Sequence, residues 1–284
     1  MQIIKNKQEL NKEIKKLKAS GKKIGFAPTM GFLHEGHTTL FKESKANTDI
    51  TVTSIFVNPA QFNDPKDYEK YPRNTESDLS KCKEAGVDIV YLPEVEDIYS
   101  GGKIPDLNMK IPHLMKNLCA TTRPGHFEGV LLVIANLFHS VEPDIAFFGL
   151  KDYQQFLIIK EFARATGFNM EVVGVETIRE PDGLAMSSRN ARLSVEDREI
   201  ATLIPRAFKL CKEYIFKRGR DPKKVKEIFS EVILSSPKMK IDYIEVLNAK
   251  DLSSQEELSG EVLIAIAIFC GEVRLIDNIR LTLV

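Results

Sequence analysis

Short apolar runs alternate with longer amphipathic stretches over the first two thirds of the chain. Apolar or β-branched runs predict buried strands at residues 22–27, 49–57, 87–92, 144–148 and 170–178. Apolar residues confined to one face predict helices at residues 6–20 and 38–45, and further helices are predicted at 75–85, 151–166 and, as an apolar helix, at 130–141. Because strand and helix alternate, we expect an α/β protein with a Rossmann-like, doubly wound and mostly parallel sheet.

This alternation weakens in two stretches between the predicted strands. Residues 63–74 are polar and contain proline, which predicts a long mobile loop of the kind that forms lids. Residues 93–128 are less regular, and alternation at residues 107–111 predicts an edge strand.

A change of pattern near residue 179 predicts a second domain. Residues 179–184 contain proline and glycine and interrupt the alternation. Beyond them, the sequence predicts helices at 195–218 and 221–235 and strands at 241–247, 261–270 and 274–284. We therefore expect a Rossmann-like domain at residues 1–178 and a smaller C-terminal α/β domain at residues 179–284, which closes over the first as a lid.

Charge and cysteine content narrow the possible functions. Lys plus Arg and Asp plus Glu each number 40, so no global field attracts nucleic acid or an anionic membrane. The four cysteines stand far apart, which indicates core residues in a reducing compartment rather than a zinc site or a disulfide framework. The longest apolar run, residues 262–270, is too short to cross a bilayer. Lysine-rich sequence follows Met1 at once, so we expect no signal peptide here. We expect a cytoplasmic protein that binds neither nucleic acid nor membrane.

The loop after the strand at 22–27 carries the strongest candidate chemistry. It contains Pro28-Thr29-Met30-Gly31-Phe32-Leu33-His34-Glu35-Gly36-His37. His34 and His37 are three residues apart at the start of a helix, so both rings lie on one side. A helix N-terminus attracts phosphate, and imidazoles add hydrogen-bond donors for a polyphosphate. The same spacing also suits a metal-binding pair or a helix cap, and the motif alone leaves the three interpretations open.

Polar residues after the strand at 49–57 form a second candidate. Gln61 can donate and accept, so it suits a carboxylate or hydroxyl ligand, although a turn-stabilising amide is an equal alternative. Arg123 and His126 precede the helix at 130–141, where they either face an anion or brace the loop. Loops at the carboxyl ends of parallel strands are the usual ligand sites of α/β sheets.

The segment after the strand at 144–148 is a third candidate. Lys151 stands between strand and helix, where a cation meets bound phosphate, and Asp152 can accept from ribose hydroxyls. Gln155 shares their helix face. The alternative is a solvated Lys-Asp pair, although a lysine at a helix N-terminus opposes the helix dipole.

Residues 186–189 form a fourth candidate. Met186-Ser187-Ser188-Arg189 places two hydroxyls beside an arginine, which predicts a phosphate clamp without a metal. The alternative is a polar linker that leads to a helix capped by Ser194.

Taken together, these motifs resemble a known family. The His-x-Gly-His loop with Met186-Ser187-Ser188-Arg189 is similar to the paired nucleotide signatures of the HIGH/KMSKS nucleotidylyltransferase superfamily. Five motifs in order resemble the pantothenate synthetase (pantoate–β-alanine ligase) family: Pro28-Thr29-Met30-Gly31, Phe56-Val57-Asn58-Pro59-Ala60-Gln61-Phe62, Arg123-Pro124-Gly125-His126-Phe127, Phe148-Gly149-Leu150-Lys151-Asp152-Tyr153-Gln154-Gln155 and Met186-Ser187-Ser188-Arg189-Asn190. The superfamily's lysine-rich second signature is replaced here by Met-Ser-Ser-Arg, which is the pattern of this branch.

The resemblance implies a two-step, ATP-dependent ligase of pantothenate and coenzyme A biosynthesis. Pantoate would attack the α-phosphorus of ATP and release pyrophosphate, and β-alanine would then displace AMP from pantoyl adenylate. It also implies Mg2+ in the first step, a homodimer, and a Rossmann-like domain that binds nucleotide and pantoate.

The resemblance further implies a role for particular residues. His34, His37 and Lys151 would be catalytic, with His37 as the proton donor, and Gln61 and Gln155 would bind pantoate, Gln61 also bordering β-alanine. The implied ATP-binding residues are Met30, Gly31, Phe32, Leu33, His34, Glu35, Gly36, His37, Gly149, Leu150, Lys151, Asp152, Ile178, Met186, Ser187, Ser188 and Arg189.

Two other functions remain compatible with these motifs. An adenylyl- or cytidylyltransferase would share the histidine loop but should carry more cations in its acceptor pocket than Gln61 and Gln155 provide. A nucleotide-sensing or protein-interaction module would keep the fold and lose the histidines or Lys151, all of which are present.

Overall fold

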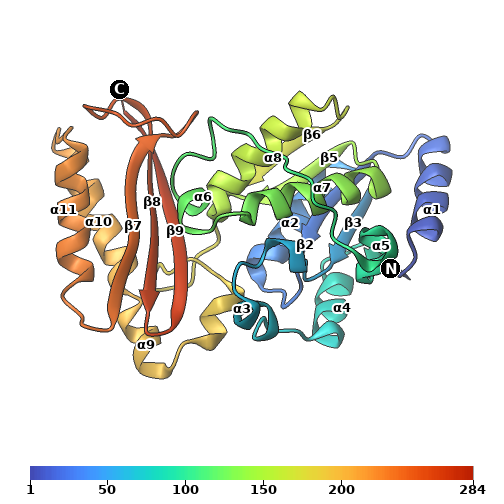
Figure 1. The fold of residues 1–284 in the computed structure, drawn as a ribbon, viewed down its shortest axis with the longest axis horizontal. Helices are drawn as coiled ribbons and strands as arrows, with labels where there is room; N and C mark the ends of the chain where they lie inside the picture. Colours follow the sequence, from blue (N-terminus) through green and yellow to red (C-terminus); the bar gives the residue numbers. More distant parts are fainter. Residues whose placement is uncertain (284) are drawn as a thin grey trace. The chain divides into compact units, whose positions relative to one another are not determined.

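The computed structural model describes residues 1–283, so the last residue of the strand predicted at 274–284 lies outside the described residues. The described chain forms two compact units (Figure 1). Unit 1 contains Met1–Ile111, Arg123–Leu150 and Gln155–Glu176, and unit 2 contains Pro112–Thr122, Lys151–Gln154 and the chain from Thr177 onward. The functional division at residue 178 stays a prediction.

Unit 1 is built on a six-stranded sheet in the order β1-β4-β3-β2-β5-β6. The strands are β1 (Gln2–Ile4), β2 (Ile24–Thr29), β3 (Ile50–Ile55), β4 (Ile89–Tyr91), β5 (Ile145–Gly149) and β6 (Glu171–Val175). Each adjacent pair is parallel. The chain proceeds from β2 to β3 and β4 on one side and then to β5 and β6 on the other, so the strand order reverses between β2 and β5. The predicted doubly wound sheet is confirmed, and this reversal marks the edge where such sheets bind ligands.

Helices cover both faces of this sheet. Right-handed crossovers place α2 (Glu35–Asn47) and α4 (Thr75–Glu84) on one face, and α1 (Lys7–Ala19), α7 (His126–Val141) and α8 (Tyr153–Ala165) on the other. In agreement, α2 contacts α4 and α1 contacts α7. Phe41, Cys82 and Val90 belong to the buried cluster between the first layer and the sheet. The shorter elements are η1 (Pro59–Gln61), α3 (Pro65–Glu69), α5 (Val95–Ile98), η2 (Ser100–Gly102) and η3 (Leu150–Asp152).

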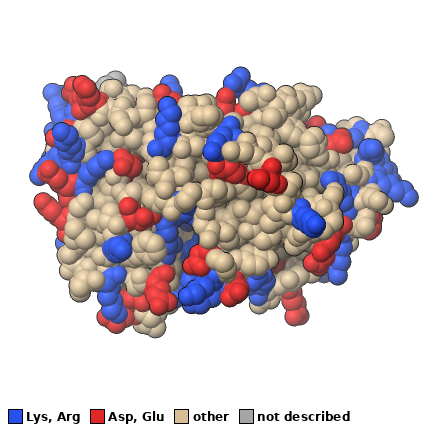
Figure 2. Space-filling view, in the orientation of Figure 1, with Lys and Arg blue, Asp and Glu red and all other residues tan. Residues whose placement is uncertain are grey.

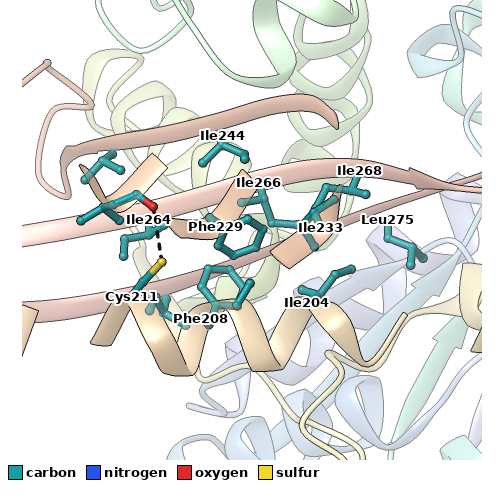
Figure 3. Close-up of a cluster of buried hydrophobic side chains, with 14 of the residues drawn as sticks. Ile204, Phe208, Cys211, Phe229, Ile233, Ile244, Ile264, Ile266, Ile268 and Leu275 are labelled. Atoms are coloured by element: carbon teal, nitrogen blue, oxygen red, sulfur yellow. Dashed lines mark hydrogen bonds between the residues drawn. The ribbon is translucent and has the colours of Figure 1, made fainter. Parts of the chain in front are cut away.

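Unit 2 contains a three-stranded antiparallel sheet in the order β7-β8-β9. Its elements are β7 (Met239–Asn248), β8 (Gly260–Cys270), β9 (Val273–Leu283), α6 (Cys119–Thr122), η4 (Ser188–Arg192), α9 (Val195–Ile200), α10 (Leu203–Phe216) and α11 (Pro222–Ile233). Figure 3 shows the core between these strands and helices α10 and α11, in which the Phe208 and Phe229 rings lie 4.9 Å apart. The Cys211 thiol is buried there and donates to the Val225 carbonyl.

The structure corrects four details of the predicted elements. Residues 63–74 are not an open loop, because α3 forms within them and Asn74 caps α4. Residues 107–111 form no strand. The helix predicted at 195–218 is two helices, α9 and α10. The short edge strand β1 has no counterpart in the predicted elements.

Charged side chains lie on the surface of the protein, and its cysteines lie in the core. Basic and acidic side chains are interspersed over the face drawn in Figure 2. Within residues 1–283, no helix is long and apolar enough to cross a membrane. Cys82, Cys119, Cys211 and Cys270 are all buried and free, and burial raises the pKa of the Cys82 and Cys211 thiols to about 12.

Candidate active site

The histidine loop of unit 1 joins β2 to α2. His34 caps the helix, because its Nδ1 accepts a hydrogen bond from the Gly36 N–H at 3.1 Å. His37 lies in the first turn of the helix, and its Nδ1 accepts a hydrogen bond from the His34 N–H at 3.2 Å. The two ring centroids lie 4.1 Å apart. The predicted pairing of the rings at the helix N-terminus is therefore present.

These two contacts fix which ring nitrogen carries the proton. A ring nitrogen that accepts a hydrogen bond is unprotonated, so a neutral imidazole with Nδ1 as acceptor carries its proton on Nε2. His34 and His37 each use Nδ1 as the acceptor. The pair therefore offers two Nε2–H donors at a helix N-terminus, which is the arrangement that an anionic oxygen requires.

A buried carboxylate holds the preceding turn in place. Asp78 of α4 is 2% exposed, and its two oxygens accept from the backbone N–H groups of Phe32 at 2.8 Å and Leu33 at 2.7 Å. Lys81, one turn on, donates to the Leu33 carbonyl. Gly31 adopts a left-handed φ of 80°, and a Cβ there would lie 2.9 Å from the Asp78 carboxylate. The turn before His34 is thus held through the N–H groups of Phe32 and Leu33 and through the Leu33 carbonyl.

We expect Asp78→Asn to disorganise this turn. An amide keeps one acceptor but sets an NH2 group against the other backbone N–H, and a buried unsatisfied donor costs about 1–3 kcal/mol. Thermal unfolding should occur at a lower temperature, whereas Glu76→Gln, the same change at an exposed position of α4, should leave the unfolding temperature unaltered. An unchanged unfolding temperature in Asp78→Asn would show that the turn does not depend on the carboxylate.

Gln61 follows β3 in η1 and is 8% exposed. Its Oε1 accepts from Asn58 Nδ2 at 3.0 Å, and its Nε2 lies 3.3 Å from the Met30 sulfur. Asn58 is held in turn by the Tyr99 hydroxyl, which donates to Asn58 Oδ1 at 2.6 Å. Burial raises the pKa of Tyr99, so the hydroxyl stays protonated and the orientation of both amides is defined. Gln61 therefore presents an NH2 donor, which suits a carboxylate or hydroxyl ligand.

Arg123 and His126 brace this segment from α7 and the turn before it. His126 Nδ1 donates to the Gln61 carbonyl at 2.7 Å, and Arg123 Nη2 donates to the same oxygen at 3.2 Å. Arg123 Nη1 also donates to His126 Nε2 at 3.0 Å, which makes the imidazole neutral with its proton on Nδ1. Of the two interpretations of these residues, loop bracing is the one that the contacts support.

In unit 2, Lys151 lies in the turn η3 between β5 and α8. Its side chain is 16% exposed, and Nζ lies 3.7 Å from an Asp152 oxygen. The Lys151 carbonyl accepts a hydrogen bond from Asn278 Nδ2 of β9 at 2.8 Å. Two residues on, the Tyr153 hydroxyl donates to the Ala249 carbonyl at 2.9 Å. The turn is thus fastened to the elements of unit 2 although it follows a strand of unit 1.

The Ser-Ser-Arg segment follows a hairpin in unit 2. Arg179 and Ala185 form an antiparallel bridge, and the Met186 N–H donates to the Ile178 carbonyl at 2.9 Å. Ser187 caps η4 by accepting from the Arg189 N–H. Arg198 contacts the hairpin through Glu180 and Asp182, and its hydrogen bond lowers the pKa of Asp182. The segment predicted to be a phosphate clamp therefore lies on a braced turn, and Ser194 caps the helix α9 that follows it, as predicted.

Several residues in these networks have no place among the sequence-derived candidates. Asp78 reaches Phe32 and Asn278 reaches Lys151 from distant parts of the chain, whereas Asn58 contacts the nearby Gln61 and is itself held by the distant Tyr99. Asn58 stands three residues before Gln61, and that spacing is the one local signal among them. Of the candidates, the structure brings together Met30 with Gln61, His34 with His37, Lys151 with Asp152 and Ile178 with Met186.

Known proteins match this chain over almost its whole length. The family described as pantoate-β-alanine ligase matches residues 2–280. The chain is 56% identical over 282 residues to a pantothenate synthetase of Leptospira interrogans, covering 99% of each chain. Its structure is similar to that of the pantothenate synthetase from Thermus thermophilus, with a TM-score of 0.92 at 37% identity over 98% of this chain and 99% of the other. The Francisella tularensis pantoate-β-alanine ligase, solved as a complex with a β-γ ATP compound and β-alanine, gives a TM-score of 0.81 at 34% identity over 98% and 97%.

The chain that carries this doubly wound sheet, the histidine-capped helix and the Met-Ser-Ser-Arg turn is a ligase, as the family match and the curated relatives show. Within that class, the chain belongs to the pantoate–β-alanine ligase family.

Proposed function

We propose that this enzyme condenses pantoate with β-alanine through a pantoyl adenylate. The pantoate carboxylate attacks the α-phosphorus of ATP and pyrophosphate leaves, and the β-alanine amine then displaces AMP to give pantothenate. The proposal rests on family membership and on the complex of the Francisella relative with a β-γ ATP compound and β-alanine.

The observation that carries the proposal is the set of fixed donors at the switch point of unit 1. The Nε2–H groups of His34 and His37 and the NH2 group of Gln61 are set by hydrogen bonds inside the protein. In-line attack on phosphorus needs positioning and charge neutralisation more than covalent help from the protein. Donors whose orientation is fixed before the substrates bind suit that requirement.

We assign the nucleotide roles as follows. His34 and His37 contact the phosphates, with His37 as proton donor, and Lys151 neutralises charge at the α-phosphate. Asp152 binds the ribose, and Ile178 lies on the adenine side. Residues 186–189 receive the leaving pyrophosphate, with Arg189 as their cation.

Mg2+ is the proposed metal of the adenylation step. Within residues 1–283, no group of three or more His, Cys, Asp or Glu residues is arranged to hold a metal ion. Mg2+ in nucleotide enzymes keeps waters and substrate phosphates as most of its ligands. We therefore expect the ion to bind together with ATP and to supply charge neutralisation at the phosphates.

The first half-reaction can be tested by isotope exchange. Labelled pyrophosphate should enter ATP when pantoate is present, without any need for β-alanine. Exchange that occurs without pantoate, or that depends on another hydroxy acid from a panel instead of pantoate, would contradict the substrate assignment.

Gln155 of α8 is proposed to bind pantoate together with Gln61. Gln155→Ala should raise the pantoate KM with a smaller effect on ATP saturation, because an amide that contacts only pantoate is lost. The adjacent Gln154 gives a contrast, since it is buried and donates to the carbonyls of Leu114 and Asn117. Gln154→Ala should lower thermal stability instead, and unchanged pantoate saturation in Gln155→Ala would remove Gln155 from the pocket.

The assembly and location of the enzyme are also proposals. We propose a homodimer, which light scattering of the purified chain would test. We place the enzyme in the cytoplasm, because the four cysteines are free and disulfides are rare in that compartment.

A further inference from the structure

Two consecutive polar residues lie buried within the apolar strand β9. Asp277 is 4% exposed and Asn278 is 6% exposed. Successive residues of a strand face opposite sides, so Asp277 shares a face with the core residues Leu275 and Ile279, and Asn278 faces the other way. Burial of polar groups is costly unless they are hydrogen-bonded. Asp277 and Asn278 therefore need hydrogen-bond partners on opposite faces of the strand.

On its own face, Asp277 binds the base of the hairpin that leads to residues 186–189. Arg179 donates to the two Asp277 oxygens at 2.7 and 2.9 Å. The same guanidinium donates to the Gly183 carbonyl within the hairpin and to the Asn278 carbonyl, both at 3.0 Å. The Asn278 N–H donates to Asp277 Oδ1 at 2.7 Å. These bonds join the hairpin to β9 at one point.

On the opposite face, Asn278 binds the Lys151 turn. Its Nδ2 donates to the Lys151 carbonyl at 2.8 Å. Arg280, the next residue on that face, lies with its guanidinium 5.4 Å from the centre of the Tyr153 ring. The Lys151 turn and the Arg179 hairpin are therefore held by neighbouring residues of a single strand.

We propose that Asp277 and Asn278 are positioning residues that set the spacing between Lys151 and the Met186–Arg189 turn. This inference rests on the proposed function, in which both segments bind the phosphates of ATP. Because the two attachment points are adjacent in β9, the strand fixes the relative position of the two cationic segments through a single peptide unit. Neither residue touches substrate; each acts through the segment that it holds.

The proposal predicts a kinetic signature for Asn278→Ala. The pantoate-dependent adenylation rate should fall by about ten- to a hundredfold, since small misplacement of a catalytic group costs that much. The pantoate KM should stay near that of the unchanged protein, because Gln61 and Gln155 lie in unit 1. Thr282→Ala, an exposed position on the same face of β9, serves as the matched control and should have no effect.

A double-mutant cycle separates positioning from general stability. If Asn278 acts only through Lys151, then Lys151→Ala combined with Asn278→Ala should be no slower than Lys151→Ala alone. Asp277→Asn should show the same non-additivity with Arg189→Ala. Effects that multiply in both cycles, or an adenylation rate that Asn278→Ala leaves unchanged, would overturn the proposal.

Two further measurements keep the test decisive. Asn278→Asp has the same shape and replaces the donor by an acceptor. If the alanine variant unfolds, Asn278→Asp should reproduce the loss of adenylation rate in a folded protein. Normal adenylation in Asn278→Asp would also overturn the proposal. Pantoate-dependent pyrophosphate exchange by the unchanged protein tests the proposed function by itself. Absence of that exchange would reject the function, whereas exchange together with unaffected Asn278 variants would reject only the positioning role.

Discussion

Replacement of Lys151 by alanine is expected to slow formation of pantoyl adenylate by at least about a hundredfold, the usual cost of removing one well-aimed charged donor. Lysine at the start of α8 opposes the helix dipole, so the position favours a bound anion that reverses this cost. Folding should change little, because the contact with Asp152 is long, at 3.7 Å, and Asp152 is 45% exposed. Single-turnover formation of pyrophosphate from ATP and pantoate, without β-alanine, measures the effect directly.

Two matched variants isolate the role of the Lys151 charge. Lys151→Arg keeps the charge and should recover part of the rate. Lys160→Ala removes an exposed lysine from α8, the helix that follows the Lys151 turn, where the ammonium lies over the Phe156 ring, and should leave adenylation unchanged. A loss smaller than tenfold in Lys151→Ala would remove Lys151 from the mechanism.

The sheet was predictable because its strands are buried on both faces. Such strands are continuous apolar runs, and five of the six in unit 1 lie within an apolar or β-branched run of the sequence. Strand β1 is as short as β4, but two of its three residues are exposed whereas all three of β4 are buried, so no buried run marks β1 in the sequence. Alternation at 107–111 was misleading because these residues form no ladder and most are exposed. Period alone does not reveal whether a neighbouring strand exists.

The missed helix boundaries had local signals in the sequence. Asp64 and Pro65 supply the cap and first residue of α3, so capping chemistry marks a helix where composition indicated a loop, and Asn74 caps α4 at the start of the helix predicted at 75–85. Pro205 stands in the first turn of α10, where proline is tolerated, and it marks a new helix start within the apolar pattern of 195–218.

The contacts of the candidate site are likewise of two kinds: some follow from local sequence, and others join residues that are far apart in the chain. His34 and His37 are neighbours through helical spacing, and Met30 and Gln61 meet because β2 and β3 are adjacent and end at the same edge. Asp78, by contrast, reaches Phe32 across 46 residues, and Asn278 reaches Lys151 across 127. A single sequence carries no trace of such contacts, because many buried polar residues are equally plausible partners.

Gly129→Ala is the second substitution expected to have a large effect, because α7 and η1 meet there backbone to backbone. A Cβ at residue 129 would lie 2.1 Å from the Ala60 carbonyl oxygen and 2.8 Å from the Gln61 nitrogen. The Gly129 carbonyl also accepts from Asn58 Nδ2, the amide that orients Gln61. The segment that carries Gln61 therefore has to move, and overpacking of this kind costs about 1–3 kcal/mol.

We expect Gly129→Ala to raise the pantoate KM and to lower the kcat of pantothenate formation, because a misplaced Gln61 weakens both pantoate binding and its positioning for reaction. The combined loss in kcat/KM should be about a hundredfold. Steady-state kinetics with pantoate varied, alongside thermal unfolding, measures the two consequences separately. Ala135→Ser adds one heavy atom at a half-buried position of the same helix and should leave pantoate saturation unchanged. If Gly129→Ala saturates with pantoate like the unchanged protein, η1 can shift without disturbing the substrate, and the assignment of Gln61 to the pantoate pocket fails.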